Sequence, residues 1–244
     1  MSKVYTAFAE VYDETYSHVP YFTWADYIHS TFLDFGVSAN ENVIEIACGT
    51  GALGRFLKPV YPQLLSLDKS AAMLAQASNK GIEDLLQADM LQLPLADNSF
   101  AGAFSCHDSL NYLGSYEQLA THFKEMARVL QPGGIYIFDL SSEENVIKNY
   151  DRQVFKNNFR KYKVYWQNFY DYTNQKITSV LEFTSKKETT VEVHEQLIFS
   201  EKLMLALTKK AGFTLKRKAA DYKQRRKLSR ANLVTYVLEL TDNK

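Results

Sequence analysis

The sequence predicts an α/β protein with a mostly parallel sheet, an antiparallel β insert and helices at its N-terminus. Three observations carry this prediction. Short apolar runs alternate with helical patterns between residues 42 and 140, the apolar period falls to about two between residues 153 and 199, and a helix and two strands close the chain. Strands that alternate with helices form parallel sheets covered on both faces, whereas a period of two is typical of antiparallel strands.

The predicted elements follow one another in a regular order. Residues 4–35 are rich in Tyr, Phe and Trp and predict one or two amphipathic helices. The insert predicts three or four antiparallel strands, separated by turns at 172–175 and 185–188. The other strands are expected at 42–47, 64–67, 85–87, 100–105, 134–140, 213–217 and 233–240. The other helices are expected at 51–57, 70–79, 115–130 and 201–211, the last of them stopped by Gly212.

Composition limits the class of protein. The chain has 244 residues, of which 46% are hydrophobic and 23% charged, close to the average for a soluble globular protein. Two cysteines, Cys48 and Cys106, are too few for a disulfide framework and fit a reducing cytosol. The N-terminus lacks a signal-peptide pattern, and no apolar stretch approaches the roughly 20 residues of a membrane helix. We therefore expect a cytoplasmic protein that does not associate with membranes.

Charge is unevenly distributed along the chain. Lys+Arg and Asp+Glu both number 28, so the formal net charge is zero, which argues against a dedicated nucleic-acid-binding protein. Residues 1–140 hold 7 basic and 16 acidic side chains, whereas residues 141–244 hold 21 and 12. Residues 216–230 hold eight basic side chains against the single acid Asp221. A basic loop at the sheet edge that binds ligands attracts anions, so Arg225 is a candidate contact for an anionic ligand.

The sharpest motif is Gly49-Thr50-Gly51-Ala52-Leu53-Gly54, which fits G-x-G-x-x-G between a predicted strand and a predicted helix. Glycines let a ligand approach the backbone, and a helix N-terminus offers free N–H groups to an anion. Asp68 ends the next strand, where a carboxylate accepts hydrogen bonds from ribose hydroxyls. By its letters the motif also fits a dinucleotide fingerprint. Glu45 weakens that alternative, because a carboxylate near the loop repels a pyrophosphate and suits an ammonium group.

Further segments fall in the order that one enzyme family shows. They are VIEIACGTG (43–51), LLSLDKSAAML (64–74), LLQADMLQLPL (85–95), FSCHDSLNYL (104–113), VLQPGGIYIFDL (129–140) and AGF (211–213). Together they resemble the class I S-adenosylmethionine-dependent methyltransferases. YTAFAEVYD (5–13) and VEVHEQLIF (191–199) are further similar to a bacterial small-molecule-type subgroup with an antiparallel β insert. The chain departs from that subgroup at Leu197 and Phe199, where a basic residue and a tyrosine are expected.

The resemblance implies a fold, a division of the chain and a cofactor. The fold is a Rossmann-like, seven-stranded, mostly parallel sheet with a C-terminal β-hairpin, and the cofactor is S-adenosyl-L-methionine. An N-terminal helical lid is expected at 1–36, the core at 37–142 and 200–244, and the insert at 143–199, as a roof over the substrate or a dimer contact. The cofactor-binding residues it implies are Tyr12, Glu45, Ala47, Cys48, Gly49 and Gly51 at the methionine part, Cys106 at the sulfonium, Asp68 at the ribose, and Lys69, Met73, Asp89 and Met90 at the adenine.

Candidate catalytic residues lie in the loop after the fourth strand, because ligands of α/β sheets bind at the carboxyl ends of the strands. Methyl transfer from a sulfonium needs orientation and a dry pocket, and no metal. His107 or Asp108 is the candidate base, and Asn111 or Tyr112 is the candidate for orienting the acceptor. The candidate substrate contacts are Trp24, Tyr112, His194 and Arg225.

We therefore expect methyl transfer to a nitrogen or oxygen atom of a small molecule, with an anionic acceptor favoured by the basic loop. One alternative is an RNA-modifying methyltransferase that uses the basic second half, although the chain has no N-P-P-[YF] base-methylating motif. Another is a non-catalytic module that binds the same cofactor. A homodimer is also open.

Overall fold

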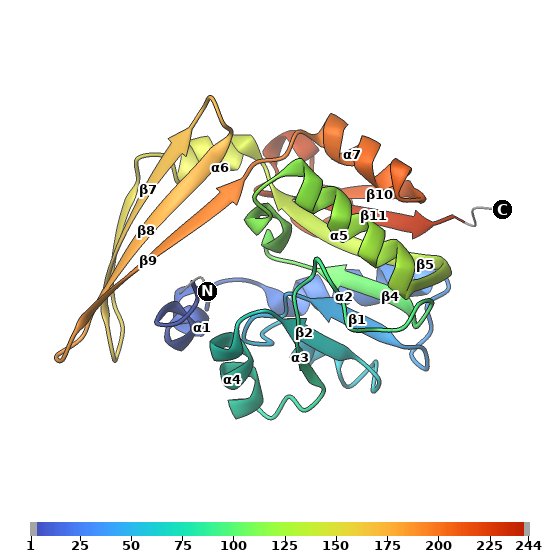
Figure 1. Cartoon of the computed structure of the whole chain (residues 1–244), viewed down its shortest axis with the longest axis horizontal. Helices are drawn as coiled ribbons and strands as arrows, with labels where there is room; N and C mark the ends of the chain where they lie inside the picture. The colour runs from blue at the N-terminus through green and yellow to red at the C-terminus, as the bar shows by residue number, and fades with distance from the viewer. Residues whose placement is uncertain (1–3, 242–244) are drawn as a thin grey trace.

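The computed structural model describes residues 4–241, and its seven-stranded sheet confirms the predicted α/β fold. The first five strands pair in parallel, and the chain then returns through two antiparallel strands to give the order β10-β11-β5-β4-β1-β2-β3 (Figure 1). The strands are β1 Val43–Ile46, β2 Leu65–Asp68, β3 Leu85–Gln87, β4 Phe100–Ser105, β5 Leu130–Ser141, β10 Phe213–Ala220 and β11 Leu233–Leu240. The closing hairpin is longer than predicted, because β10 continues through its basic residues.

Helices cover both faces of this sheet (Figure 1). On one face α5 (Tyr116–Val129) and α7 (Glu201–Lys210) bury a cluster in which the rings of Phe123 and Phe138 lie 5.6 Å apart. On the other face α2 (Tyr21–Asp34) and α3 (Gly54–Leu57) bury a second cluster. The sheet is therefore buried on both sides, as a parallel sheet requires. Among residues 4–241 no helix has the length and apolar character needed to cross a bilayer.

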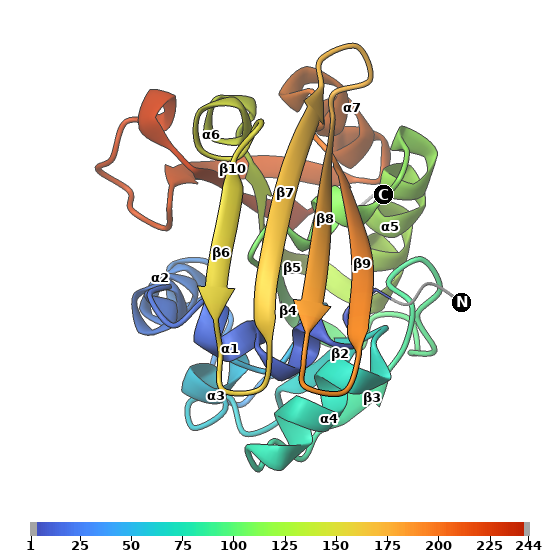
Figure 2. The same cartoon turned by 90° about the vertical axis from the view of Figure 1, so that its left-hand side faces the viewer.

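A four-stranded antiparallel sheet stands apart from the first sheet (Figure 2). Its strands, in the order β6-β7-β8-β9, are β6 Val154–Asn158, β7 Lys163–Asp171, β8 Lys176–Thr184 and β9 Thr189–Leu197. The predicted turns at 172–175 and 185–188 join them. Helix α6 (Glu143–Asn149), which the sequence analysis missed, precedes this sheet. Ser142 caps this helix, because its hydroxyl accepts from the backbone N–H of Asn145. Serine is a preferred N-cap residue, so the sequence already held a signal for the start of the helix.

Strand β9 turns its apolar side chains outward and its polar ones inward. Val191 and Val193 are 53% and 47% exposed, whereas Glu192 and His194 are 2% and 4% exposed. An alternating strand usually buries its apolar face. The opposite arrangement is stable here because the buried carboxylate of Glu192 finds hydrogen-bond donors in the N-terminal segment, as described below.

The N-terminal segment lies between the two sheets and beside helix α4 (Ala71–Asn79) (Figure 1). Within residues 4–35 the structure contains the predicted helix as α2. Two short helices precede it, η1 (Phe8–Glu10) and α1 (Tyr12–Thr15). The apolar side chains of these turns pack on the inner face of the four-stranded sheet. The buried members of that cluster are Ala7, Phe8, Val11, Tyr162, Val164, Leu181 and Phe183.

Gly102 lets helix α2 pack closely on strand β4. A Cβ atom at this position would lie 2.9 Å from Cε1 of Phe32 and 3.2 Å from Cγ1 of Val37. Both neighbours belong to the same buried cluster. The missing side chain therefore sets the distance between the sheet and the helix that carries Tyr21 and Trp24.

Gly102→Ala is expected to lower the free energy of unfolding by about 1–3 kcal/mol, because the added methyl group displaces packed side chains. Urea denaturation measures the change. Gly114→Ala is the matched control, since its nearest neighbour would be Oε1 of Gln118 at 3.6 Å. Equal urea midpoints for the two variants would show that Gly102 has no packing role.

Candidate functional site

Two neighbouring cavities open at the carboxyl ends of the parallel strands, and both are lined by Tyr12 and His107. The glycine-loop cavity encloses about 360 Å³ and the aromatic cavity about 630 Å³, each partly open to solvent. The residues that line the glycine-loop cavity are Tyr12, Tyr21, Glu45, Ala47, Cys48, Gly49, Ala52, Leu53, Cys106, His107 and Ser109. The structure thus brings together six of the residues predicted to bind the cofactor: Tyr12, Glu45, Ala47, Cys48, Gly49 and Cys106.

The glycine loop exposes its backbone to the first cavity. Gly49 and Gly51 have φ angles of +55° and +70°, which glycine adopts without strain. A Cβ atom at Gly49 would meet no atom within 4 Å, so the space above it is free for a ligand. A Cβ atom at Gly51 would lie 2.0 Å from Cδ1 of Ile82, so this glycine serves packing instead.

Asp68 holds the glycine loop in place from the end of β2. Its carboxylate accepts from the backbone N–H groups of Gly49 and Ser70, each at 2.8 Å. Burial raises its pKa. A carboxylate has about four lone-pair positions, so two remain for hydroxyl donors. This half-buried acceptor fits the diol of a ribose.

Glu45 is a buried carboxyl group without a positive partner. It is 3% exposed, and it accepts from the Ser66 hydroxyl at 2.9 Å. Burial raises its pKa to about 8. None of the ion pairs among residues 4–241 includes it. Because Glu45 lines the glycine-loop cavity, the ammonium group of a bound amino acid would supply the missing charge.

The residues predicted at the adenine lie outside the cavity lining, beside the ends of β2 and β3. Lys69 pairs with Asp89 at 2.7 Å, and Asp89 also accepts from the backbone N–H of Leu91. Met73 is buried and Met90 is half-buried. Asp89 is partly exposed and has unused acceptor positions, which fits an amino group.

A polar cluster fastens α1 to the glycine loop. Oγ1 of Thr50 donates to Oδ1 of Asp13 at 2.6 Å, and Lys80 forms an ion pair with the same carboxylate. The Lys80 ammonium group also donates to the backbone carbonyl of Thr50 at 2.9 Å. The sequence analysis missed this cluster, because its three residues belong to elements distant in the chain.

Asp139 on β5 fixes the loop that follows β4. His107 and Asp108 have φ angles of +62° and +50°, a conformation that costs non-glycine residues about 1–3 kcal/mol each. The buried Asp139 carboxylate accepts their backbone N–H groups at 2.9 and 2.5 Å and also accepts from the Tyr222 hydroxyl. Burial raises the pKa of Asp139 to about 6. Its signal in the sequence was a lone acid within the apolar run 135–140, which the sequence analysis did not use.

This loop places Asp108 and His107 in the cavity walls. The pKa values of the two side chains are shifted in opposite directions. Burial and the nearby Asp139 raise the pKa of Asp108 to about 7, against a hydrogen bond from Ser141 at 2.9 Å. Burial and the nearby His18 lower the pKa of His107 to about 4. The imidazole of His107 is therefore neutral near pH 7, and the Tyr12 hydroxyl lies 2.9 Å from its Nδ1. Of the two candidate bases, Asp108 titrates near neutral pH.

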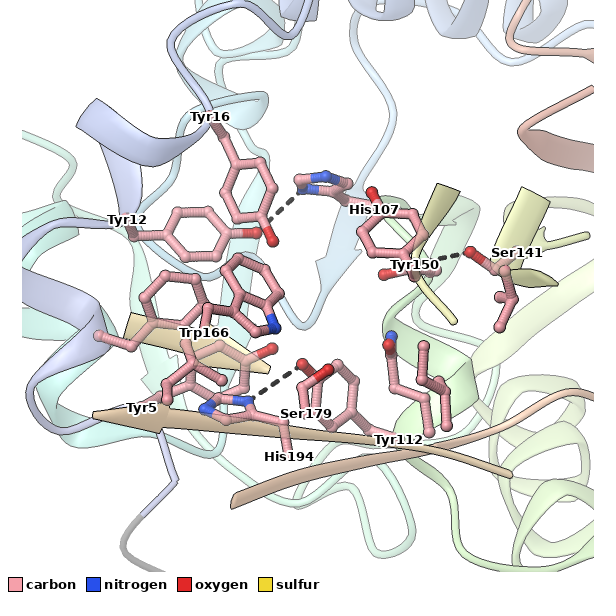
Figure 3. A pocket seen from close by; sticks show the side chains of 16 residues that line it. Tyr5, Tyr12, Tyr16, His107, Tyr112, Ser141, Tyr150, Trp166, Ser179 and His194 are labelled. Carbon is pink, nitrogen blue, oxygen red and sulfur yellow. Dashed lines mark hydrogen bonds between the residues drawn. The ribbon is translucent and has the colours of Figure 1, made fainter. Parts of the chain in front are cut away.

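The aromatic cavity lies between the N-terminal segment, the loop after β4 and the four-stranded sheet (Figure 3). Rings dominate its wall, and none of its sixteen lining residues is a lysine or arginine. Besides Tyr12 and His107, three predicted site residues line it, namely Asp108, Tyr112 and His194. Sequence reasoning missed the other aromatic and polar side chains of this wall, which are Tyr5, Phe8, Tyr16, Ser141, Tyr150, Trp166, Ser179 and Gln196.

Three of the residues predicted for catalysis or substrate contact line neither cavity. The Asn111 side chain donates to the carbonyl of Leu197 at 2.6 Å and accepts from the N–H of Ser141 at 3.0 Å, so its amide ties two backbone segments together. Trp24 is buried, and its ring stacks on Tyr222 with centroids 4.6 Å apart. Arg225 is exposed.

The basic segment 216–230 reaches the predicted sheet edge but not the cavities. The pairing of Leu233 with Ser141 puts the loop before β11 at the carboxyl end of β5. None of the eight basic side chains lines either cavity. Four of them pair with acids instead, as Lys216–Glu239, Arg217–Asp34, Lys218–Glu201 and Arg226–Asp221.

Comparison with known proteins gives consistent results. A family model described as "Methyltransferase domain" matches residues 44–138. The chain is 30% identical over 227 residues to "Putative methyltransferase YqeM" of Bacillus subtilis (strain 168), covering 90% of each protein. A structure described as an S-adenosylmethionine-dependent methyltransferase from Clostridium acetobutylicum aligns with a TM-score of 0.85 and 24% identity, over 98% of this chain and 99% of that one. The sugar N-methyltransferase KedS8 from Streptoalloteichus sp. aligns with a TM-score of 0.73 and 20% identity, over 97% and 93%.

Binding of S-adenosylhomocysteine is expected to release a proton from Glu45. With a pKa of about 8, this carboxyl group is largely protonated at pH 7 and must ionise to hold an ammonium group. Affinity should therefore fall as the pH drops below 8, approaching about tenfold per pH unit. Calorimetric titration in buffers of different ionisation enthalpy measures both the affinity and the released proton.

Glu45→Gln should weaken binding and abolish the proton release. Glu83→Gln, at an exposed position, serves as the matched control and should behave like the unmodified protein. Equal affinity and no buffer dependence in both the unmodified protein and Glu45→Gln would contradict this assignment.

Proposed function

The chain belongs to the class I S-adenosylmethionine-dependent methyltransferase family, and we propose that it methylates an amino nitrogen of a small molecule held in the aromatic cavity. The cofactor, S-adenosyl-L-methionine, supplies the methyl group from its sulfonium. The observation that carries the proposal is the half-buried Asp108 carboxyl group in a cavity wall that contains no lysine or arginine. The protein's contribution is to hold both reactants, exclude water and accept a proton.

The cofactor would lie in the glycine-loop cavity. Glu45 would hold the ammonium group, Gly49 would leave room for the methionine part, and Asp68 would accept from the ribose hydroxyls. Tyr12 and His107 line both cavities, so they mark where the cavities meet. The methyl group would cross to the acceptor at this boundary, beside the hydrogen-bonded pair of side chains.

The walls of the aromatic cavity favour a small acceptor. Sixteen residues line this partly open space, and most of its wall is aromatic or apolar. Its aromatic rings come from three parts of the chain and surround the space from several sides (Figure 3). The basic segment 216–230, which would suit RNA, contributes nothing to this wall.

The charge of the cavity favours an amine over an anionic acceptor. An amine enters as an ammonium ion, which pairs with a carboxylate, and it must lose one proton before its lone pair attacks carbon. Asp108 has a pKa of about 7, so its ionised form is available near neutral pH to take that proton. The similarity in fold to the sugar N-methyltransferase KedS8 supports an amine acceptor.

Asp108→Asn is expected to lower kcat/KM for an amine acceptor by about 10²- to 10⁴-fold. In the unmodified enzyme kcat/KM should rise as the pH passes through 7, because the base is active when ionised. Transfer of labelled methyl groups to panels of amino sugars and alkylamines, carboxylic acids, and bulk tRNA measures the preference. The proposal would be refuted if the carboxylic acids or the tRNA became labelled and the amines did not.

Ser141→Ala is the matched variant for this pH profile. The Ser141 hydroxyl donates to Asp108 and stabilises its ionised form. Its removal should move the rise in kcat/KM to higher pH without abolishing activity. An unchanged profile would indicate that another group is the base.

A further inference from the structure

The carboxylate of Glu192 joins the four-stranded sheet to the N-terminal segment. Oε1 accepts from the backbone N–H groups of Thr6, Ala7 and Phe8 at 2.9, 2.6 and 3.2 Å, and Oε2 accepts from that of Tyr5 at 2.9 Å. Nε2 of His194 lies 3.1 Å from Oε2. Five donors therefore converge on one buried side chain.

Glu192 is ionised at neutral pH. Burial alone would raise its pKa, but the hydrogen bonds from His194 and from the N–H groups of Phe8 and Ala7 hold the pKa below its usual value. An ionised carboxylate accepts hydrogen bonds and donates none. The facing nitrogen of His194, Nε2, must therefore carry a hydrogen.

The protonation of Nε2 sets the direction of the next hydrogen bond. In a neutral imidazole with hydrogen on Nε2, the other nitrogen, Nδ1, has a free lone pair. The Tyr112 hydroxyl lies 3.2 Å from this Nδ1, on the wall of the aromatic cavity (Figure 3). Tyr112 then donates its hydrogen to His194, and its oxygen, which also accepts from the Tyr5 hydroxyl, keeps one lone pair for the cavity.

The other groups that face His194 do not compete for its Nδ1. The rings of Tyr5 and Phe8 meet the imidazole edge-on, with centroids 4.8 and 5.5 Å away. Ser179, which pairs with His194 across the strands, donates its hydroxyl to Asn168.

We propose that Glu192 and His194 are positioning residues that present the Tyr112 oxygen to the N–H group of the acceptor amine. An amine that donates to this oxygen turns its lone pair away from it and toward the remaining space of the cavity. The role of Tyr112 rests on the proposed function, because it needs an amine acceptor. The hydrogen bonds of Glu192 do not depend on that function.

The same carboxylate makes this orientation depend on the docked N-terminal segment. Tyr5, Phe8, Tyr12 and Tyr16 line the aromatic cavity, and Tyr12 also lines the glycine-loop cavity. If residues 5–8 undock, Glu192 loses four of its five donors and both cavities lose a wall. Docking of the segment and orientation of the acceptor are thus coupled through one side chain.

The imidazole tautomer of His194 provides the first test, because it needs no acceptor. In protein labelled with ¹⁵N-histidine, the nitrogen shifts of His194 should report hydrogen on Nε2 and none on Nδ1 near neutral pH. Replacement of His194 assigns the signal. A neutral ring with its hydrogen on Nδ1, or an imidazolium ring with hydrogen on both nitrogens, would overturn the proposal.

Amide hydrogen exchange at residues 5–8 provides the second test. Glu192→Gln should speed exchange at these amides by about tenfold or more, because hydrogen bonds to a charged acceptor are lost. His194→Gln keeps an N–H donor near Glu192 and removes the group that faces Tyr112, so exchange should stay within about threefold of the unmodified protein. Glu195→Gln, an exposed position on the same strand, is the control.

Steady-state kinetics test the coupling between His194 and Tyr112. Once an amine acceptor is found, His194→Gln and Tyr112→Phe should each lower kcat/KM, and the double variant should be no worse than either one. Additive losses would overturn the orientation of Tyr112 by His194, and unchanged exchange in Glu192→Gln would overturn the docking. If both physical tests succeed and no amine is methylated, the proposed acceptor class fails while the docking stands.

Discussion

The hydrogen bonds of Glu192 are the contact on which the shape of both cavities depends. Burying a carboxylate costs free energy unless hydrogen-bond donors surround it. Here four of the donors are backbone N–H groups of a segment more than 180 residues earlier in the chain. These N–H groups offset the cost of burying the charge, and the carboxylate in turn holds the segment between the two sheets. Because that segment carries Tyr12, which lines both cavities, one contact holds a wall of both cavities in place.

Four acids at this edge of the sheet behave differently because they receive different numbers of donors. Glu45 accepts from the Ser66 hydroxyl, and burial raises its pKa to about 8. Asp108 lies next to another carboxylate, and its pKa rises to about 7. Asp139 has three donors and a pKa of about 6, and Glu192, with five donors, has a lowered pKa. The first two are thus suited to a charge or proton that a ligand brings, and the last two to holding the protein's own backbone.

Periodicity and motif spacing predicted the sheet, and the carboxyl-end rule predicted the loop with His107 and Asp108. Those signals are local, whereas the missed residues act over long distances in the chain. Asp139 holds a loop about thirty residues earlier, and Glu192 holds a segment more than 180 residues earlier. The same limit explains β9, where a polar face is buried because of a partner that the strand itself does not reveal. It also explains the basic segment, whose charge indicated an anionic ligand although its side chains face acids and solvent.

In the proposed reaction the methyl group passes from the glycine-loop cavity to the aromatic cavity beside the hydrogen-bonded pair Tyr12 and His107. A crystal structure of the protein with S-adenosylhomocysteine tests it most directly. The account predicts the sulfur atom at this boundary, the ammonium group beside Glu45, the ribose beside Asp68, and the aromatic cavity still open. A homocysteine part that fills the aromatic cavity, or a sulfur atom that faces away from it, would contradict the claim.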